Sequence, residues 1–227
     1  MNSVSAEDRT APPNDEMQRT SPGQDGGSPL ISVLSGRVTR AAMIDIHATL
    51  AELAQRRPLF HSEADFQHAV AWDLHVRFPT AGVRLERPIR TPKGLLHVDL
   101  VADFGAYTLV AELKYKTRAV AATLQGEDFA LRDHAAQPSS RYEFLKDVTR
   151  LESIQALRPK TLCWAILLTN DSAYWFEPKG AAGISADFTL CDGRECSGTL
   201  KWGANTSAST MKGREAALEL SGRYRMA

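Results

Sequence analysis

The stretch from 97 to 116 constrains the fold of this chain more than any other. Two β-rich runs flank Gly105-Ala106, and a Gly that opens a two-residue connection is typical of a type II′ hairpin turn. With these two residues as the loop, counting outward along both strands places Asp99 directly opposite Glu112. The sequence therefore predicts a hairpin that carries two acidic side chains on one face.

The same count divides the hairpin into an apolar face and a charged face, because side chains alternate along a strand. The expected apolar face consists of Val98, Leu100, Ala102, Leu109, Ala111 and Leu113. The expected charged face surrounds two valines and consists of His97, Asp99, Asp103, Thr108, Glu112, Lys114 and Lys116. Acids that face each other at a Cβ separation of about 4.5–5.5 Å destabilise a sheet unless a positive group lies between them. A divalent cation, an ammonium group, or both would meet this need.

Asp99, Glu112 and Lys114 allow two interpretations. Acids and lysines are common on the solvent face of a half-exposed hairpin, where they need no further role. The order of the charges instead favours metal-assisted phosphodiester hydrolysis. In that chemistry two carboxylates hold Mg²⁺, the metal lowers the pKa of a bound water, and the lysine stabilises the attacking water or the developing charge.

Val98-Asp99, the following strand and Glu112-Leu113-Lys114 resemble the PD-(D/E)xK motif of the restriction-endonuclease-like nuclease superfamily. The resemblance implies that Asp99 and Glu112 are metal ligands and that Asp99, Glu112 and Lys114 are the catalytic residues. It also implies Mg²⁺ or Mn²⁺ as the cofactor. The motif departs from the family at its first position, where Val98 stands in place of proline.

Ser62-Glu63-Ala64-Asp65 has the spacing of a capping box and predicts a helix that runs to about Phe78. Glu63 falls inside the apolar arc of this helix and is expected to point toward the sheet. It is either a favourable charge at the positive end of the helix dipole or, as in several families of the superfamily, a third metal ligand. Asp73 has Arg77 four residues later, which predicts a local ion pair.

The order of the expected elements indicates the fold class. A strand over 83–89 precedes the hairpin, and a capping box at Ser140 opens a helix that ends near Leu157. The continuous apolar run over 161–169 is typical of a strand buried on both faces. Helix, three meandering strands, helix and strand is the order of the superfamily core. The resemblance thus implies an α/β protein with a restriction-endonuclease-like core.

Basic residues in this predicted core are candidates for contacts with nucleic acid. Lys146 and Arg150 lie four residues apart on the second helix, on the side opposite its apolar stripe. Such a pair usually marks a solvated face, and contact with phosphate is the more specific interpretation. Arg141 and Lys116 complete the set of predicted contacts.

Composition divides the chain into three parts. Residues 1–40 are rich in Ser, Pro, Gly and Asp without an apolar period, which predicts a disordered leader. Residues 41–172 form the expected nuclease-like core, and residues 173–227 an extension of short strands packed on it. Those strands are expected over 187–190, 198–202 and 216–220.

Charge and apolar content limit the classes of function. The 227 residues include 27 basic and 27 acidic side chains, so any basic surface must be local. The sequence contains no apolar run long enough for a signal peptide or a membrane span, which favours a cytoplasmic protein without a membrane partner. Three cysteines without zinc-ligand spacing are expected to be free thiols.

The sequence therefore predicts a metal-dependent nuclease whose partner is DNA and which can act as a homodimer. The alternative is a nucleic-acid-binding or scaffolding module that keeps the same fold without turnover.

Overall fold

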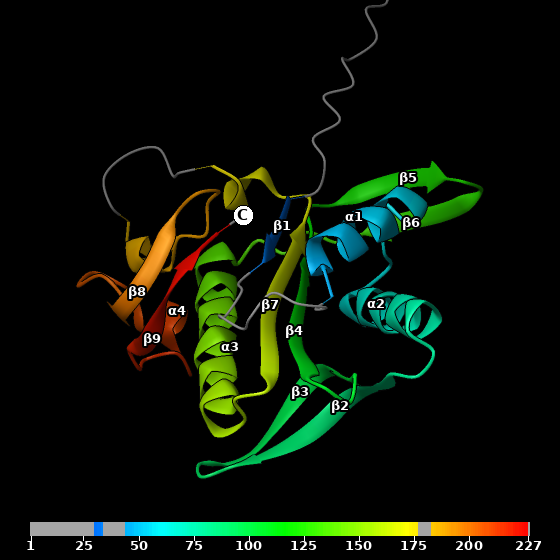
Figure 1. Ribbon diagram of the computed structural model, residues 1–227. Helices are drawn as coiled ribbons and strands as arrows, with labels where there is room; N and C mark the ends of the chain where they lie inside the picture. Colours follow the sequence, from blue (N-terminus) through cyan, green and yellow to red (C-terminus); the bar gives the residue numbers. More distant parts are fainter. Residues whose placement is uncertain (1–29, 34–43, 177–182, 227) are drawn as a thin grey trace, which may run out of the picture.

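A five-stranded mixed sheet in the order β1-β7-β4-β3-β2 forms the centre of the protein (Figure 1). The structure, a computed structural model, describes residues 30–33, 44–176 and 183–226. The strands of the sheet are β1 (Leu30–Val33), β2 (Gly82–Thr91), β3 (Gly94–Asp103), β4 (Thr108–Lys116) and β7 (Thr161–Thr169). Strands β2, β3 and β4 form an antiparallel meander, and β7 lies parallel to β4.

The register of the predicted hairpin is confirmed from the turn to Leu100 and Ala111, but the ladder ends there and does not reach the expected pair of Asp99 and Glu112. Strands β3 and β4 pair from Asp103 and Thr108 to Leu100 and Ala111, as the two-residue loop requires. Gly105 has a φ of +78°, the left-handed conformation that the turn demands and glycine adopts without strain. The expected strand over 161–169 is also confirmed, because every residue of β7 is buried.

Strand β3 changes face at Asp99. The ladder between β3 and β4 ends at Leu100, and the pairing between β2 and β3 skips Asp99 and Glu86. As a result Leu100 packs on one side of the sheet and Val98 on the other, although the two lie two residues apart. The prediction that Val98 shares a face with Leu100 is wrong, because the alternation of an unbroken strand does not continue through this irregularity.

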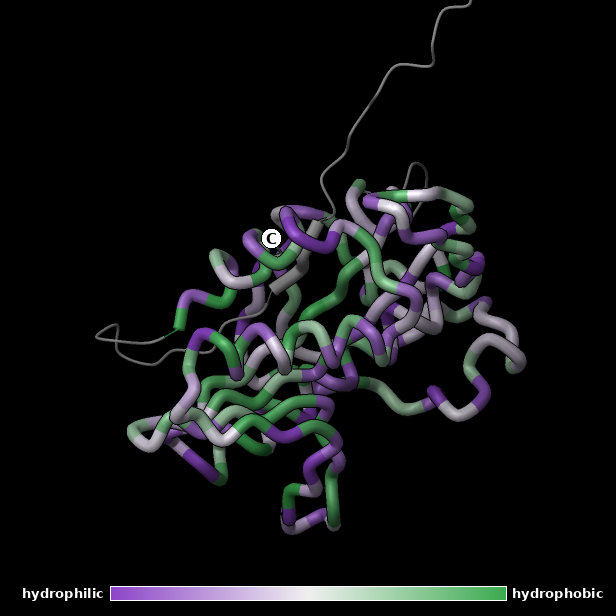
Figure 2. The backbone as a smooth tube through the Cα atoms, turned by 90° about the vertical axis from the view of Figure 1, so that its right-hand side faces the viewer, coloured by the Kyte–Doolittle hydropathy of each residue, from purple (hydrophilic) through white to green (hydrophobic). Residues whose placement is uncertain are grey.

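Helices cover both faces of the sheet. Helices α1 (Ile46–Arg56) and α2 (Glu63–Arg77) pack on the side of Leu100, and α3 (Gln137–Leu157) packs on the side of Val98. Figure 2 shows hydrophobic segments running side by side through the middle of the protein, where the strands lie. In the described residues, no helix is long and apolar enough to cross a membrane.

The predicted start of α2 is confirmed and that of α3 is wrong. The side chain of Ser62 caps α2 by accepting a hydrogen bond from the backbone N–H of Asp65. Helix α3 begins three residues before Ser140, without a side-chain cap, because Pro138 in its first turn already has the φ of a helix. Asp73 forms the predicted ion pair with Arg77, at 2.6 Å, and a second one with Arg56.

Short elements surround this core. After the sheet strand β4 comes the hairpin of β5 (Val120–Leu124) and β6 (Glu127–Leu131), and after β7 a 3₁₀ turn, η1 (Ser172–Tyr174). The C-terminal part contains the 3₁₀ turn η2 and the short helix α4, followed by an antiparallel pair of strands. Their bounds are η2 (Ala186–Phe188), β8 (Glu195–Leu200), α4 (Ala208–Met211) and β9 (Leu218–Arg225).

The C-terminal part differs from the sequence expectation at one strand. Residues 187–190 form no strand, because the turn η2 buries Phe188 in the core and lets the Asp187 carboxylate accept the backbone N–H of Lys201. All three cysteines are buried free thiols, as predicted. Four residues of the expected leader form β1, and residues 1–29 and 34–40 lie outside the described residues.

Glu152 of α3 fastens β9 to the core. Its Oε1 accepts hydrogen bonds from the backbone N–H of Gly222 at 2.7 Å and from the hydroxyl of Tyr224 at 2.6 Å. Its Oε2 accepts one from the N–H of Ser221 at 3.0 Å. A single carboxylate thus satisfies three donors, and hydrogen bonds to a charged group are stronger than neutral ones.

We expect Glu152→Ala to lower the free energy of unfolding by about 2–3 kcal/mol, because three donors at the contact lose their acceptor. Urea unfolding followed by circular dichroism measures this loss. Glu219→Ala, on the exposed side of β9, removes only a contact with Thr199 and should change stability by less than about 0.5 kcal/mol. Equal losses in the two variants would contradict this role of Glu152.

Candidate active site

Strands β3 and β4 bring the predicted acids and the predicted lysine together. Asp99 leaves the ladder and its Oδ2 accepts the backbone N–H of Leu113 at 2.7 Å. The Nζ of Lys114 lies 4.0 Å from the same oxygen, and the Glu112 side chain is only 2% exposed. Glu112 and Lys114 lie two residues apart on β4 and therefore share the side of the sheet that α3 covers.

Helix α3 adds Asp147, which sequence reasoning missed. The Oδ2 of Asp147 lies 3.2 Å from the Nζ of Lys114, and its side chain is 6% exposed. The sequence does contain a signal for this residue. Asp147 lies between Phe144 and Val148 within the buried stripe of α3, where a carboxylate is costly unless it is paired.

Arg150 faces the same cluster. Its Nη1 lies 3.2 Å from Glu112 Oε1 and 2.7 Å from Asp147 Oδ1, and its Nη2 donates to the backbone oxygen of His97 at 2.5 Å. The expectation that Arg150 lies on the solvated side of α3 is wrong. Glu112 on β4 and Asp147 on α3 lie between the helix and the sheet, and the long arginine side chain reaches back to both and to the backbone oxygen of His97.

Burial and crowding of like charges shift the pKa of the two strand acids. Burial, together with the negative charges of Asp147 and Asp99, raises the pKa of Glu112 to about 9, although Arg150 and Lys114 oppose the shift. Burial also raises the pKa of Asp99, against the hydrogen bond from Leu113 and the charge of Lys114. In the absence of a further cation, Glu112 is therefore the acid of the cluster that holds a proton at neutral pH.

The neighbouring carboxylates keep Lys114 charged. Burial alone lowers the pKa of a lysine, but the negative charges of Asp147 and Asp99 outweigh it and the pKa of Lys114 rises. The cluster thus holds a fixed ammonium beside three carboxyl groups.

Two buried carboxylate oxygens of the cluster face a cation without accepting a hydrogen bond of good geometry. Within the described part of the chain, Glu112 Oε1 lies 3.2 Å from Arg150 Nη1, and Asp147 Oδ2 lies 3.2 Å from Lys114 Nζ. Oxygens of this kind are the donors that Mg²⁺ and Mn²⁺ prefer. Within residues 44–176 and 183–226, no three acidic, histidine or cysteine side chains are arranged to hold a metal by themselves.

Glu63 lies beside β4 rather than against the two strand acids. Its Oε2 accepts the backbone N–H of Tyr115 at 2.9 Å and lies 3.2 Å from the Nζ of Lys116. The charge of Glu63 contributes to the raised pKa of Lys114. Lys116 is partly buried and forms its ion pair with Glu63 rather than with the acids of the cluster.

The other two basic residues predicted to contact nucleic acid, Arg141 and Lys146, form no ion pair with the cluster in the described part of the chain. Arg141 is 7% exposed, donates to the backbone oxygen of Ala173 at 2.6 Å and lies over the ring of Tyr174. These contacts are those of an arginine that supports the fold. Lys146 is half-buried and pairs with Glu143 at 3.6 Å.

The fold and this cluster define a mixed α/β protein with a partly buried site of three carboxyl groups, one lysine and one arginine. Comparisons with protein-family models, with curated proteins and with solved structures find no match.

Proposed function

We propose that this protein is a Mg²⁺- or Mn²⁺-dependent nuclease that hydrolyses phosphodiester bonds in DNA. One observation carries the proposal. Asp99 and Glu112 come from adjacent strands and share one side of the sheet with Lys114, whose Nζ lies 4.0 Å from Asp99 Oδ2. Two carboxylates beside a fixed ammonium are the groups that metal-assisted phosphodiester hydrolysis requires.

The order of the elements supports a restriction-endonuclease-like core. Helix α2 precedes the meander of β2, β3 and β4, and α3 then leads into β7, which runs parallel to β4. The sheet lies between α2 on one side and α3 on the other, and the acids lie where β3 leaves the ladder. Because fold alone does not define activity, the chemistry of the cluster carries the weight of the proposal.

Asp99 and Glu112 are the residues that would hold the metal. Mg²⁺ keeps several waters in its coordination shell and binds through one or two protein carboxylates, so two acids suffice. Glu112 Oε1 faces Arg150 at 3.2 Å without accepting a hydrogen bond of good geometry, and a carboxylate oxygen of this kind fits such a role. When bound, a divalent cation lowers the pKa of water and offsets the charge of the phosphate.

The other side chains of the cluster have separate roles. Lys114 would stabilise the negative charge that develops on the phosphate, and Asp147, at 3.2 Å, is the positioning residue that orients the lysine. Arg150 pairs with Glu112 and Asp147 and so limits the repulsion among the acids. Glu63 holds Lys116 beside β4 and is not needed as a third ligand.

One observation favours a second candidate, a nucleic-acid-binding module without turnover. Arg150 and Lys114 already neutralise part of the charge of the three carboxyl groups, as cations do in ion-pair clusters that serve structure alone. In that case the cluster would stabilise the fold and would bind no metal.

Cleavage of plasmid, linear duplex and single-stranded DNA with Mg²⁺ or Mn²⁺ separates the two candidates. We expect cutting by the wild type, its loss in EDTA, and a reduction of at least about 100-fold in Asp99→Ala. Asp192→Ala, which removes an exposed acid in the C-terminal part, is the matched control and should cut normally. Absence of cutting by the wild type, or equal cutting by Asp99→Ala, would exclude the nuclease.

A further inference from the structure

Strand β2 and the turn that follows it carry an unusual set of basic residues. Arg84, Arg87, Arg90 and Lys93 are all exposed. In the described part of the chain, no carboxylate oxygen lies within 4.0 Å of their charged nitrogens, whereas Arg56, Arg57, Arg77 and Arg150 are all paired with acids. In a chain of formal net charge zero, this strand is a local concentration of unpaired positive charge.

Two of these residues lie on the same side of the sheet as the carboxyl cluster. Arg84 pairs with Val101 and Arg87 with Val98, and both valines belong to the core beneath α3. Residues paired across two strands share a face, so the two arginines share it as well. An arginine three residues after another normally faces the opposite side. Here Glu86, with a φ of +50°, interrupts the alternation of β2, so Arg87 faces the same side of the sheet as Arg84.

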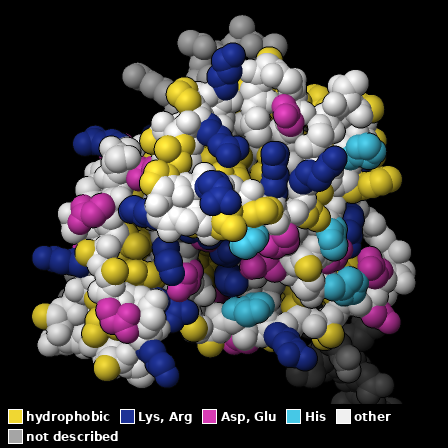
Figure 3. Space-filling model, turned by 90° about the horizontal axis from the view of Figure 1, so that it is seen from below, with side chains coloured by type: hydrophobic (Ala, Val, Ile, Leu, Met, Phe, Trp, Pro, Cys, Tyr) yellow, Lys and Arg dark blue, Asp and Glu magenta, His cyan; other side chains and the backbone are white. Residues whose placement is uncertain are grey.

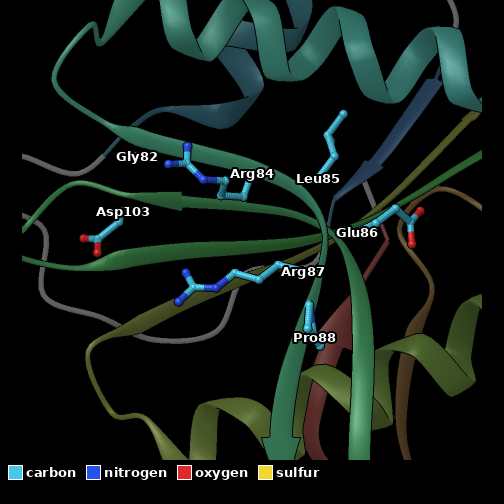
Figure 4. Close-up of a pocket in the computed structure, with 7 residues that line it drawn as sticks. All are labelled: Gly82, Arg84, Leu85, Glu86, Arg87, Pro88 and Asp103. Atoms are coloured by element: carbon cyan, nitrogen blue, oxygen red, sulfur yellow. The ribbon is translucent and has the colours of Figure 1, made fainter.

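The two guanidinium groups border an open hollow on β2. Figure 4 shows Arg84, Arg87 and Asp103 reaching to one side of the strands and Glu86 pointing to the other. The hollow has a volume of about 510 Å³. Asp103 is its only acid on that side among the residues that line it, and its Oδ1 already accepts the backbone N–H of Gly105 at 2.8 Å.

This hollow is next to the proposed catalytic centre. Glu86, between the two arginines, lies at the level of Asp99 on β3, and neighbouring strands are only about 4.8 Å apart. Figure 3 shows the end of the protein at which β2 and β3 lie, with Lys and Arg side chains gathered around Asp, Glu and His. A chain of phosphates that crosses β2 would therefore continue toward the carboxyl cluster.

We propose that Arg84 and Arg87 bind the phosphate backbone of the nucleic acid and guide it to Asp99 and Glu112. The choice of nucleic acid as the partner rests on the proposed function. The positions of the charges support it independently. Arg84 and Arg87 border the same hollow, where Asp103 is the only lining acid on their side, and guanidinium groups match phosphate oxygens in geometry.

The binding of a short fluorescent DNA duplex, followed by anisotropy in EDTA over a series of salt concentrations, tests this proposal without any cleavage. We expect Arg84→Ala/Arg87→Ala to weaken binding at least about tenfold and to reduce the dependence of log K on log salt by about two, one for each lost phosphate contact. Both side chains are exposed, so the variant should unfold at the same temperature as the wild type.

Arg223→Ala/Arg225→Ala is the matched control, because it removes two exposed arginines from β9 and should leave binding unchanged. Arg84→Lys/Arg87→Lys should retain most of the salt dependence, since the charges remain. Equal binding by the β2 variant and the wild type would overturn the proposal, as would competition by polyglutamate as strong as that by unlabelled DNA.

The same proteins distinguish this inference from the proposed function. Binding that depends on Arg84 and Arg87 without any metal-dependent cutting by the wild type would support the basic surface and exclude the nuclease. Normal metal-dependent cutting, together with DNA binding that is unchanged in Arg84→Ala/Arg87→Ala, would support the nuclease and contradict the proposed role of the two arginines.

Discussion

Lys114→Ala is expected to slow Mg²⁺-dependent DNA cleavage by about 10²–10³-fold, the usual loss when a fixed donor to a developing oxyanion is removed. The acids of the cluster hold the lysine in place, with Asp147 at 3.2 Å and Asp99 at 4.0 Å from its Nζ. The raised pKa of Lys114 keeps it charged at neutral pH, so its ammonium is available to the phosphate. Single-turnover cleavage with enzyme in excess over DNA measures the loss in the chemical step.

Lys116→Ala is the matched control for this variant. Lys116 lies two residues further along β4, is similarly exposed, and pairs with Glu63 rather than with the acids of the cluster. It should change single-turnover cleavage far less than Lys114→Ala does. If the two variants lose activity equally, the effect comes from a loss of charge on β4 and not from the position of Lys114.

Measuring Mg²⁺ binding by the Lys114→Ala variant distinguishes a role of Lys114 in the chemical step from a role in folding. Lys114→Ala removes a positive neighbour from Asp99 and should not weaken binding of the cation, which calorimetry can measure directly. A variant that has lost both metal binding and its thermal transition would only show that Lys114 supports the fold, and would contradict its assignment to the chemical step.

The part of this site that the sequence reveals is the part that local rules control. Gly105 and the alternation of side chains along a strand predict the hairpin and the approach of Asp99 to Glu112. The structure confirms the register from Asp103 to Leu100, and Asp99 lies just beyond this paired region. Likewise, the unbroken apolar run over 161–169 predicts a strand buried on both faces, because only such a strand tolerates apolar side chains at every position.

The part of the site that the sequence does not reveal depends on contacts between residues that are distant in the sequence. Asp147 and Arg150 reach the cluster only because α3 packs across β3 and β4, and helical periodicity alone cannot show what a buried acid meets. The change of face at Val98 has a similar origin. It requires the irregular pairing of β2 and β3 at Glu86 and Asp99, and neither a turn residue nor a change in hydrophobic pattern predicts this irregularity from the sequence.

The affinity for Mg²⁺ should rise with pH up to about pH 9, because Glu112 must lose its proton before it can ligate a cation. Its pKa of about 9 means that the proton is still present at neutral pH in the metal-free protein. Binding should therefore release about one proton, which calorimetry in buffers of different ionisation enthalpy detects. Glu112→Gln should abolish both the binding and the proton release, whereas Glu195→Gln, at an exposed acid of β8, should preserve both.

The same raised pKa of Glu112 also predicts how the stability of the metal-free protein depends on pH. The folded-state pKa of Glu112 lies above the ordinary value of 4.5, so the folded protein binds more protons than the unfolded chain between pH 4.5 and about 9. Stability therefore falls as pH rises through this window, which is the opposite of the usual effect of a carboxylate in an ion pair.

Urea unfolding in EDTA at several pH values checks this sign. The wild type should lose stability between neutral pH and about pH 9, and the loss should be smaller in Glu112→Gln, which keeps the shape of the side chain without a group that ionises. If the wild type instead gains stability with pH, Glu112 is ionised in the folded protein and is neutralised by Arg150. Mg²⁺ would then have to compete with that ion pair, and its binding would release no proton from Glu112.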